Sequence, residues 1–188
     1  MSMPAPTPVA TIDELLALPD DGLRHELLDG VHVVTPAPEL PHQAMLGVLH
    51  HALARALEEG DELVLLASPA DVRLGARSLV QPDLFVVRKR PGHILRTWSE
   101  VGTPVVAIEV LSPGTAARDR GAKRSLYQRA GVAEYWIVDL DARLVERWRP
   151  GDVRPEVVSD RLVWDPLPTV TARLELPALF ASVLGPLE

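Results

Sequence analysis

The hydrophobic and polar positions are organised most clearly between Ile108 and Leu140, where a strand, a helix and a second strand follow one another. Residues 105–111 are almost continuously apolar, as in a strand that is buried on both faces. A helix capped near Thr115 and ended by Gly131 leads directly into an apolar strand at Tyr135–Val138. A strand–helix–strand segment of this length predicts a right-handed crossover between two parallel strands.

Polar residues interrupt this unit at a few positions only. Glu109 is the one carboxylate in the first apolar run, and Asp119, Lys123 and Tyr127 recur every four residues on one face of the helix. The crossover places the start of the helix over the end of the strand, so we expect Glu109 and Lys123 to be neighbours. A buried acid that faces a lysine is a candidate functional site. The pattern alone leaves open a buried ion network of Glu109, Lys123 and Asp119 that holds the helix to the sheet.

The chain before this unit alternates between short strands and helices. Thr11 is a good N-cap for a short helix, and Asp29-Gly30 predicts a tight hairpin turn between two strands, with Glu26 just before the turn. The apolar spacing from Pro41 to Glu59 predicts a long amphipathic helix that covers one face of the sheet and ends at Gly60. For Glu26, the pattern favours an exposed or salt-bridged strand acid.

A second carboxylate of interest precedes another apolar run. Short strands at Leu63–Ala67 and Val72–Leu74 are followed by a further strand. Pro82 cannot donate a hydrogen bond to a sheet, so we expect this strand to begin at Asp83 and to run through Val87. Asp83 therefore opens its strand, whereas Glu109 nearly closes its own. If the two strands pair antiparallel, these carboxylates come together.

The remaining segments carry less chemistry. The loop 88–103 is basic at its start, and we expect a solvated surface excursion rather than a phosphate-binding loop. Residues 144–148 predict a strand that pairs back as a hairpin, and the segments 153–158 and 162–164 predict edge strands before a short terminal helix around Leu174–Phe180. Residues 1–10 are rich in proline and alanine and predict a disordered lead-in, so we expect a single domain over residues 11–188.

Composition limits the function classes. The 188 residues are 47% hydrophobic and 24% charged, which is typical of a globular protein, and cysteine is absent, which excludes disulfides, thiolate zinc sites and cysteine nucleophiles. The chain shows no leader and no apolar run of about 18 residues, so we expect a cytoplasmic protein without a membrane partner. The net charge of −7 predicts no tight nonspecific binding to nucleic acid, which would have to use a local basic patch.

Histidines invite a metal interpretation that their spacing does not support. His42, His50 and His51, with His25 and His32 nearby, include no i, i+4 pair and no HExxH pattern. We therefore expect most of them to be surface or packing residues.

The segments PDLFVV and IEVLSPGTAARDRGAKRSLYQRAGVAEYWIVD resemble the bacterial "putative restriction endonuclease" family, formerly a domain of unknown function, of the PD-(D/E)XK nuclease superfamily. The resemblance covers roughly Glu26 to Trp148. It implies an α/β fold of the α+β type, with a restriction-endonuclease-like core and helices on both faces of a mixed sheet. This agrees with the antiparallel pair and the crossover expected from the pattern.

The resemblance also implies roles for individual residues. Asp83 and Glu109 match the signature acids, and Leu111 stands where the signature lysine would be, so the lysine has moved into the helix as Lys123. These three are the expected catalytic residues. Supporting positions are Glu26, His42, Asp119 and Tyr127, and the implied metal ligands are Asp83, Glu109, Glu26 and the backbone carbonyl of Val110.

The implied activity is a metal-dependent endonuclease that hydrolyses phosphodiester bonds of nucleic acid, most simply DNA, with Mg²⁺ or Mn²⁺ as cofactor. The alternative is a catalytically weak or inactive nuclease fold that binds nucleic acid or another partner. Cutting both strands of a duplex would suit a homodimer.

Asp83 and Glu109 should repel each other without a cation, so we expect the pKa of at least one to rise, and Asp83→Asn to preserve or slightly improve stability.

Overall fold

The structure is a computed structural model that describes residues 9–58 and 60–186. Most of the predicted lead-in, the expected end of the long helix at Glu59 and the last two residues lie outside the described residues. The helices are α1 (Ile12–Leu16), α2 (Leu40–Leu57), η1 (Trp98–Glu100), α3 (Ala116–Arg118), η2 (Asp119–Lys123), α4 (Arg124–Arg129) and α5 (Leu176–Leu184). The strands are β1 (Arg24–Leu28), β2 (Val31–Thr35), β3 (Leu63–Ala67), β4 (Val72–Arg73), β5 (Leu79–Val80), β6 (Leu84–Arg88), β7 (Val106–Val110), β8 (Glu134–Asp139), β9 (Leu144–Trp148), β10 (Glu156–Val158), β11 (Arg161–Leu167) and β12 (Val170–Glu175).

A mixed six-stranded sheet forms the centre of the molecule, in the order β10-β9-β8-β7-β6-β3. Strands β7 and β8 are parallel and β6 and β7 are antiparallel, which confirms both predicted pairings. Leu84 pairs with Ile108, so the register continued by one residue sets Asp83 opposite Glu109. The predicted start of this strand was one residue early, because β6 begins at Leu84 and Asp83 directly precedes it.

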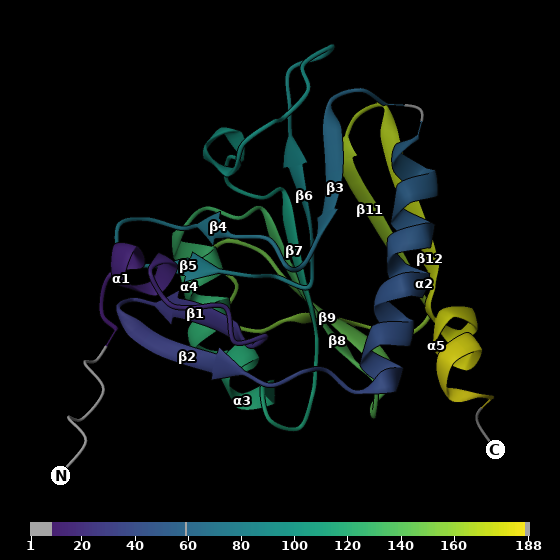
Figure 1. Cartoon of the computed structure of the whole chain (residues 1–188). Helices are drawn as coiled ribbons and strands as arrows, with labels where there is room; N and C mark the ends of the chain where they lie inside the picture. Colours follow the sequence, from purple (N-terminus) through teal and green to yellow (C-terminus); the bar gives the residue numbers. More distant parts are fainter. Residues whose placement is uncertain (1–8, 59, 187–188) are drawn as a thin grey trace, which may run out of the picture.

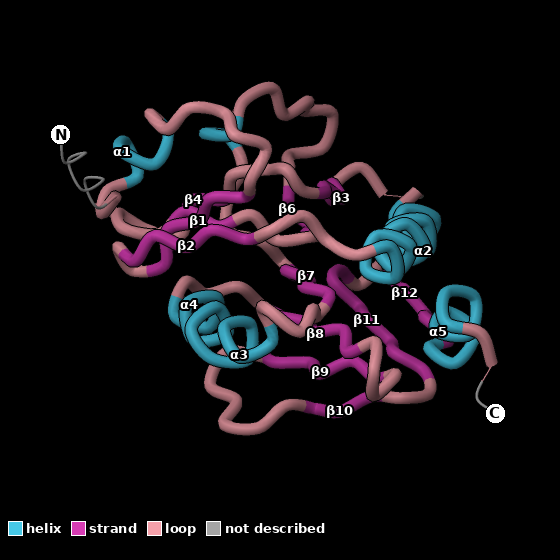
Figure 2. Tube along the Cα trace, turned by 60° about the horizontal axis from the view of Figure 1, so that its bottom comes forward, coloured by secondary structure: helices cyan, strands magenta, loops and turns pink. Residues whose placement is uncertain are grey.

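The two faces of the central sheet carry separate hydrophobic cores, because side chains alternate along each strand. One face packs against α2, α5 and the two-stranded sheet β11–β12, and the other against α4 and a four-stranded sheet, β2-β1-β5-β4 (Figures 1 and 2). Within β6, Leu84 and Val86 enter the first core, whereas Phe85 and Val87 enter the second. Helices therefore lie on both faces of a mixed sheet.

Local signals in the sequence explain several boundaries. Thr11 caps α1 in a capping box with Glu14. Asp29 and Gly30 both have positive φ, 52° and 85°, as a two-residue hairpin turn with the twist of its strands requires. At the end of α4, Gly131 has a φ of 76° and the Val132 N–H donates to the Tyr127 carbonyl at 3.1 Å, which is the predicted glycine stop.

Other features were not predicted. The helix after β7 is three consecutive segments, α3, the π-helical turn η2 and α4. At the C-terminal end, Leu174 belongs to β12, and the terminal helix starts after it.

The loop after β6 is largely exposed and contributes no residue to the cavity described below, as expected of a surface excursion. Within the described part of the chain, no helix combines the length and the apolar character that a membrane crossing requires.

Candidate active site

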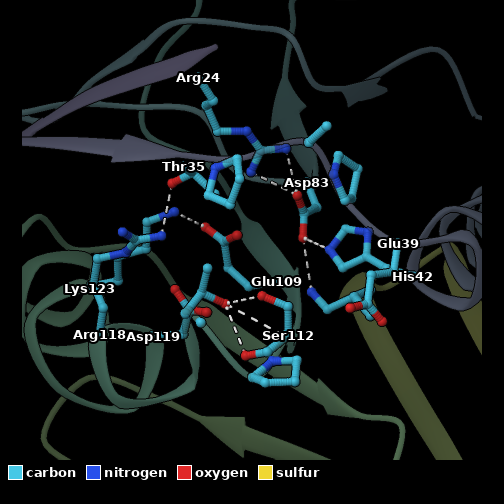
Figure 3. A pocket seen from close by; sticks show the side chains of 17 residues that line it. Arg24, Thr35, Glu39, His42, Asp83, Glu109, Ser112, Arg118, Asp119 and Lys123 are labelled. Carbon is cyan, nitrogen blue, oxygen red and sulfur yellow. Dashed lines mark hydrogen bonds and ion pairs between the residues drawn. The ribbon is translucent and has the colours of Figure 1, made fainter.

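A cavity of about 160 Å³ lies where the two larger sheets meet, beside the start of α2 and the turn after β7. It brings together most of the residues that the sequence singled out, namely Asp83, Glu109, Lys123, His42 and Asp119 (Figure 3). Val110 also lines it. Glu26 and Tyr127 do not line the cavity, although both contact residues that do.

Asp83 is buried, and its carboxylate contacts three different groups. Both terminal nitrogens of Arg24 lie 2.8 Å from Oδ1. Oδ2 lies 3.1 Å from Nε2 of His42 and accepts the Val110 N–H at 2.9 Å. Burial raises the pKa of this carboxyl, but His42, Arg24 and the Val110 N–H outweigh it, so the pKa lies below its usual range. Asp83 is therefore ionised in the protein at neutral pH.

Lys123 is 1% exposed and lies between two carboxylates. Its Nζ is 2.7 Å from Oε1 of Glu109 and 2.8 Å from Oε1 of Glu26. Burial favours the neutral amine, but the charges of Glu109 and Glu26 outweigh it and raise the pKa of Lys123. A lysine that keeps its proton cannot accept one from water, so this geometry favours charge stabilisation over general-base chemistry for Lys123.

Glu109 shows the expected effect of crowded carboxylates. Burial, with the nearby charges of Asp83, Asp119 and Glu26, raises its pKa to about 8, although Lys123 acts in the opposite direction. The Tyr127 hydroxyl donates to Oε1 at 3.1 Å. The predicted rise therefore occurs at Glu109. The pKa of Asp83 is lowered instead, because His42 and Arg24 contact that carboxylate and outweigh its burial.

The π-helical turn η2 begins with Asp119 and ends with Lys123, and both side chains are buried. The Tyr135 hydroxyl donates to the Asp119 backbone carbonyl at 3.2 Å. Oδ1 of Asp119 and Oε2 of Glu26 are buried and have no hydrogen-bond partner in the described part of the chain, and burial raises the pKa of Asp119. Single π-helical turns inside helices occur frequently at functional sites. Here the turn sets the spacing between an acid and the lysine on one side of the cavity.

Two arginines of the cavity were missed by the sequence analysis. Arg24 stands two residues before Glu26 in β1, and strand alternation sends both side chains to the same side of the sheet. Because side chains alternate along a strand, the position of Arg24 two residues before Glu26 could have identified it from the sequence. Arg118 precedes Asp119 at the end of α3, and the regular four-residue spacing of the helix gave no reason to select it.

The described residues contain no group of three or more His, Asp or Glu side chains placed to hold a metal ion. Two of the implied ligands, Asp83 and Glu109, share the cavity, and Glu109 Oε2 forms no hydrogen bond within that part of the chain. Carboxylate oxygens suit Mg²⁺, which is commonly held by one or two carboxylates and completes its shell with water. The donor chemistry therefore fits a site of two carboxylates, provided that Arg24 leaves Asp83 Oδ1.

The other two implied ligands are less well placed. Oε1 of Glu26 lies 2.8 Å from Lys123 and accepts the Gln81 N–H at 2.8 Å, outside the cavity lining. Val110 contacts Asp83 through its N–H.

Among the other histidines, Nδ1 of His25 lies 2.9 Å from Nε2 of His32, which agrees with the expected packing role.

Comparisons with known proteins agree with the resemblance in the sequence. A family model described as "Uma2: Putative restriction endonuclease" matches residues 12–179. The chain also resembles a solved structure of a "putative nuclease belonging to DUF820" from Anabaena variabilis, with a TM-score of 0.74 and 22% identity over 93% of this chain and 99% of that one. At this identity the likeness shows a shared fold. No curated protein matches the chain.

Proposed function

The chain belongs to the Uma2 "Putative restriction endonuclease" family, and from this premise we propose that it is a metal-dependent endonuclease that hydrolyses phosphodiester bonds of DNA. The observation that supports the proposal most is the meeting of Asp83, Glu109 and Lys123 around one cavity. The residues come from two antiparallel strand ends and the following helix. Two acids can hold a divalent ion, and a buried ammonium group can stabilise the negative charge that develops on a phosphate.

In this proposal Asp83 and Glu109 would hold Mg²⁺ or Mn²⁺. Such an ion, when bound, neutralises charge that builds on a phosphate and helps to generate a nucleophile from water. His42 and the Val110 N–H orient Asp83 through Oδ2, and the Tyr127 hydroxyl orients Glu109 through Oε1. The charged Lys123 would stabilise negative charge on the phosphate as its bond to the leaving oxygen breaks.

A second candidate function rests on the ion pairs of the site. Asp83 is paired with Arg24, and Glu109 with Lys123, so both carboxylates are compensated by the protein's own cations. Carboxylates that are already compensated have less need of a metal ion, which favours a nuclease fold that binds nucleic acid or another partner without cleaving it. The two functions differ in one property, because only the enzyme must bind a divalent ion between Asp83 and Glu109.

The test is cleavage of supercoiled plasmid and of single-stranded DNA by the purified protein, with Mg²⁺, with Mn²⁺ and with EDTA. The enzyme is expected to nick or cut only with a divalent ion, and Asp83→Ala should abolish cleavage. Asp141→Ala is the matched control, since Asp141 is exposed and its side chain forms no hydrogen bond within the described residues. Cleavage that persists in EDTA, or that Asp83→Ala retains in full, would contradict the proposal. Binding of DNA without cleavage under all conditions would support the second candidate.

A further inference from the structure

Three side chains with a permanent positive charge line the cavity: Arg24, Arg118 and Lys123. Two of them are already neutralised, Arg24 by Asp83 and Lys123 by Glu109 and Glu26. Arg118 forms no salt bridge with any residue of the described ranges 9–58 and 60–186. It is therefore the cavity cation whose charge remains available to a ligand.

The guanidinium of Arg118 is nevertheless held in place. Its Nη2 donates to Oγ1 of Thr35 at 2.8 Å, which links α3 to the end of β2 at one side of the cavity (Figure 3). Its Nε is buried and has no hydrogen-bond partner among the residues that the structure describes. Buried N–H groups in native proteins are nearly always paired, so an unpaired one beside a cavity indicates an acceptor that is absent from the chain itself.

The neighbouring Asp119 does not supply that acceptor. Asp119 is close enough for Arg118 to lower the pKa of its carboxyl, against the dominant effect of burial, yet the two side chains form no ion pair. Thr35 provides a neutral hydroxyl only. The contacts therefore position Arg118 without compensating its charge.

We propose that Arg118, positioned by Thr35, binds a phosphodiester group of the nucleic-acid backbone in this cavity. This inference rests on the proposed function and names the residue that brings the substrate's phosphate to the acids. A guanidinium presents a planar fork of N–H donors that matches two phosphate oxygens, and it stays charged at every relevant pH. Asp119 forms no salt bridge within the described residues and repels an approaching phosphate, so a cation without a counter-ion is needed on the approach side.

The first measurement is the affinity for a fluorescein-labelled 16-base-pair duplex in EDTA, followed by fluorescence anisotropy at several salt concentrations. Loss of one phosphate contact lowers the slope of log K against log salt by about 0.9. Arg118→Gln is expected to weaken binding and to reduce the slope by this amount. Arg154→Gln is the control, because Arg154 is exposed and its substitution changes the net charge by the same amount as Arg118→Gln.

A second probe separates a phosphate contact from any other effect of charge. Thymidylyl-thymidine contains one phosphodiester, whereas thymidine has none. The dinucleotide is expected to raise the melting temperature of the wild type and of Arg154→Gln but not that of Arg118→Gln, and thymidine should raise none of them. Thr35→Val keeps the charge of Arg118 and removes its anchor, so it should weaken binding of both phosphodiester probes, which provides a test even if Arg118→Gln does not fold.

The outcomes distinguish this inference from the proposed function. If Arg118→Gln keeps the wild-type slope and the wild-type response to the dinucleotide, the phosphate site is wrong, and metal-dependent cleavage by the wild type can still stand. If the wild type binds neither probe and cleaves nothing, both proposals fail. Wild-type affinity in Thr35→Val would overturn the role given to Thr35.

Discussion

The charge state of each carboxyl in the cavity is set by its own neighbours. Asp83, directly before β6, and Glu109 in β7 lie beside the same cavity, yet the pKa of Asp83 is lowered and that of Glu109 is raised to about 8. Arg24 and His42 contact Asp83 directly, whereas Glu109 is surrounded by further acids and shares Lys123 with Glu26. The site therefore contains one firmly ionised carboxylate and one carboxyl that titrates near neutral pH.

Asp83→Asn is expected to destabilise the metal-free protein by about 3 kcal/mol, because it removes the partner of a largely buried guanidinium. This reverses the expectation from the sequence, which considered repulsion from Glu109 and lacked Arg24. Urea unfolding in EDTA measures the effect, with Asp141→Asn as the exposed control. Equal stability of Asp83→Asn and wild type would show that the Arg24–Asp83 pair contributes little.

The raised pKa of Glu109 predicts how stability depends on pH. Between the unfolded-state value near 4.5 and the folded-state value of about 8, the folded protein binds more protons at this group than the unfolded chain does. Stability without metal should therefore fall as pH rises through this window, by at most about 1.4 kcal/mol per pH unit. The other charged groups that act on Glu109 are Lys123, Asp83, Asp119 and Glu26, and the substitution Glu109→Gln changes none of them.

The variant Glu109→Gln should flatten the pH dependence measured by denaturant unfolding between pH 5 and pH 8. The wild type provides the reference at each pH. A slope that is unchanged in Glu109→Gln would assign the proton uptake to another group, with Asp119 as the first to examine because burial raises its pKa as well.

At the scale of elements, the strand–helix–strand unit was predictable because its signals are local. An apolar run, a cap and a glycine stop lie within a few residues of the positions that they determine. The π-helical turn η2 was not predictable, since nothing in DRGAK distinguishes five residues of π-helix from a regular α-helix. The separate four-stranded sheet was missed for another reason, because it depends on the contact of Leu27 with Leu79, far apart in the sequence.

Two glycines of this unit should respond oppositely to alanine. A Cβ on Gly121 would meet no atom within 4 Å, and its φ is not positive, so Gly121→Ala should stabilise the helix by about 0.5–1 kcal/mol. Gly131 has a φ of 76°, so Gly131→Ala should destabilise by about 1 kcal/mol or more. Thermal unfolding of both variants tests this. A Gly121→Ala variant that loses stability would show that the π-helical turn depends on the flexibility of glycine.

For the whole molecule, the docking of the β11–β12 sheet on the central sheet depends on an aromatic contact. The rings of Trp136 in β8 and Trp164 in β11 meet edge to face, with centroids 5.4 Å apart. Sequence alone identified both as strand residues but could not pair them, because the contact joins two separate sheets. The core on this face includes α2 and α5 as well.

Trp164→Ala should therefore destabilise the protein by about 3–5 kcal/mol, since it removes a large side chain that is 2% exposed. Trp98→Ala is the matched control, because Trp98 is 50% exposed and its removal should change stability by less than about 0.5 kcal/mol. Guanidinium unfolding followed by circular dichroism compares the two. Similar effects for both variants would contradict the docking of β11–β12 on the core.

The exposed connection between β6 and β7 divides the cavity's residues into two groups along the chain. Arg24, His42 and Asp83 precede it, and Glu109 and Lys123 follow it. Each carboxylate has a cation from its own segment, while the Lys123–Glu26 pair joins the two. A polypeptide cleaved in this connection would thus give two fragments, neither of which contains both acids. The proposed cleavage of DNA would then require the two fragments to reassociate, so the protein could be tested as a split reporter.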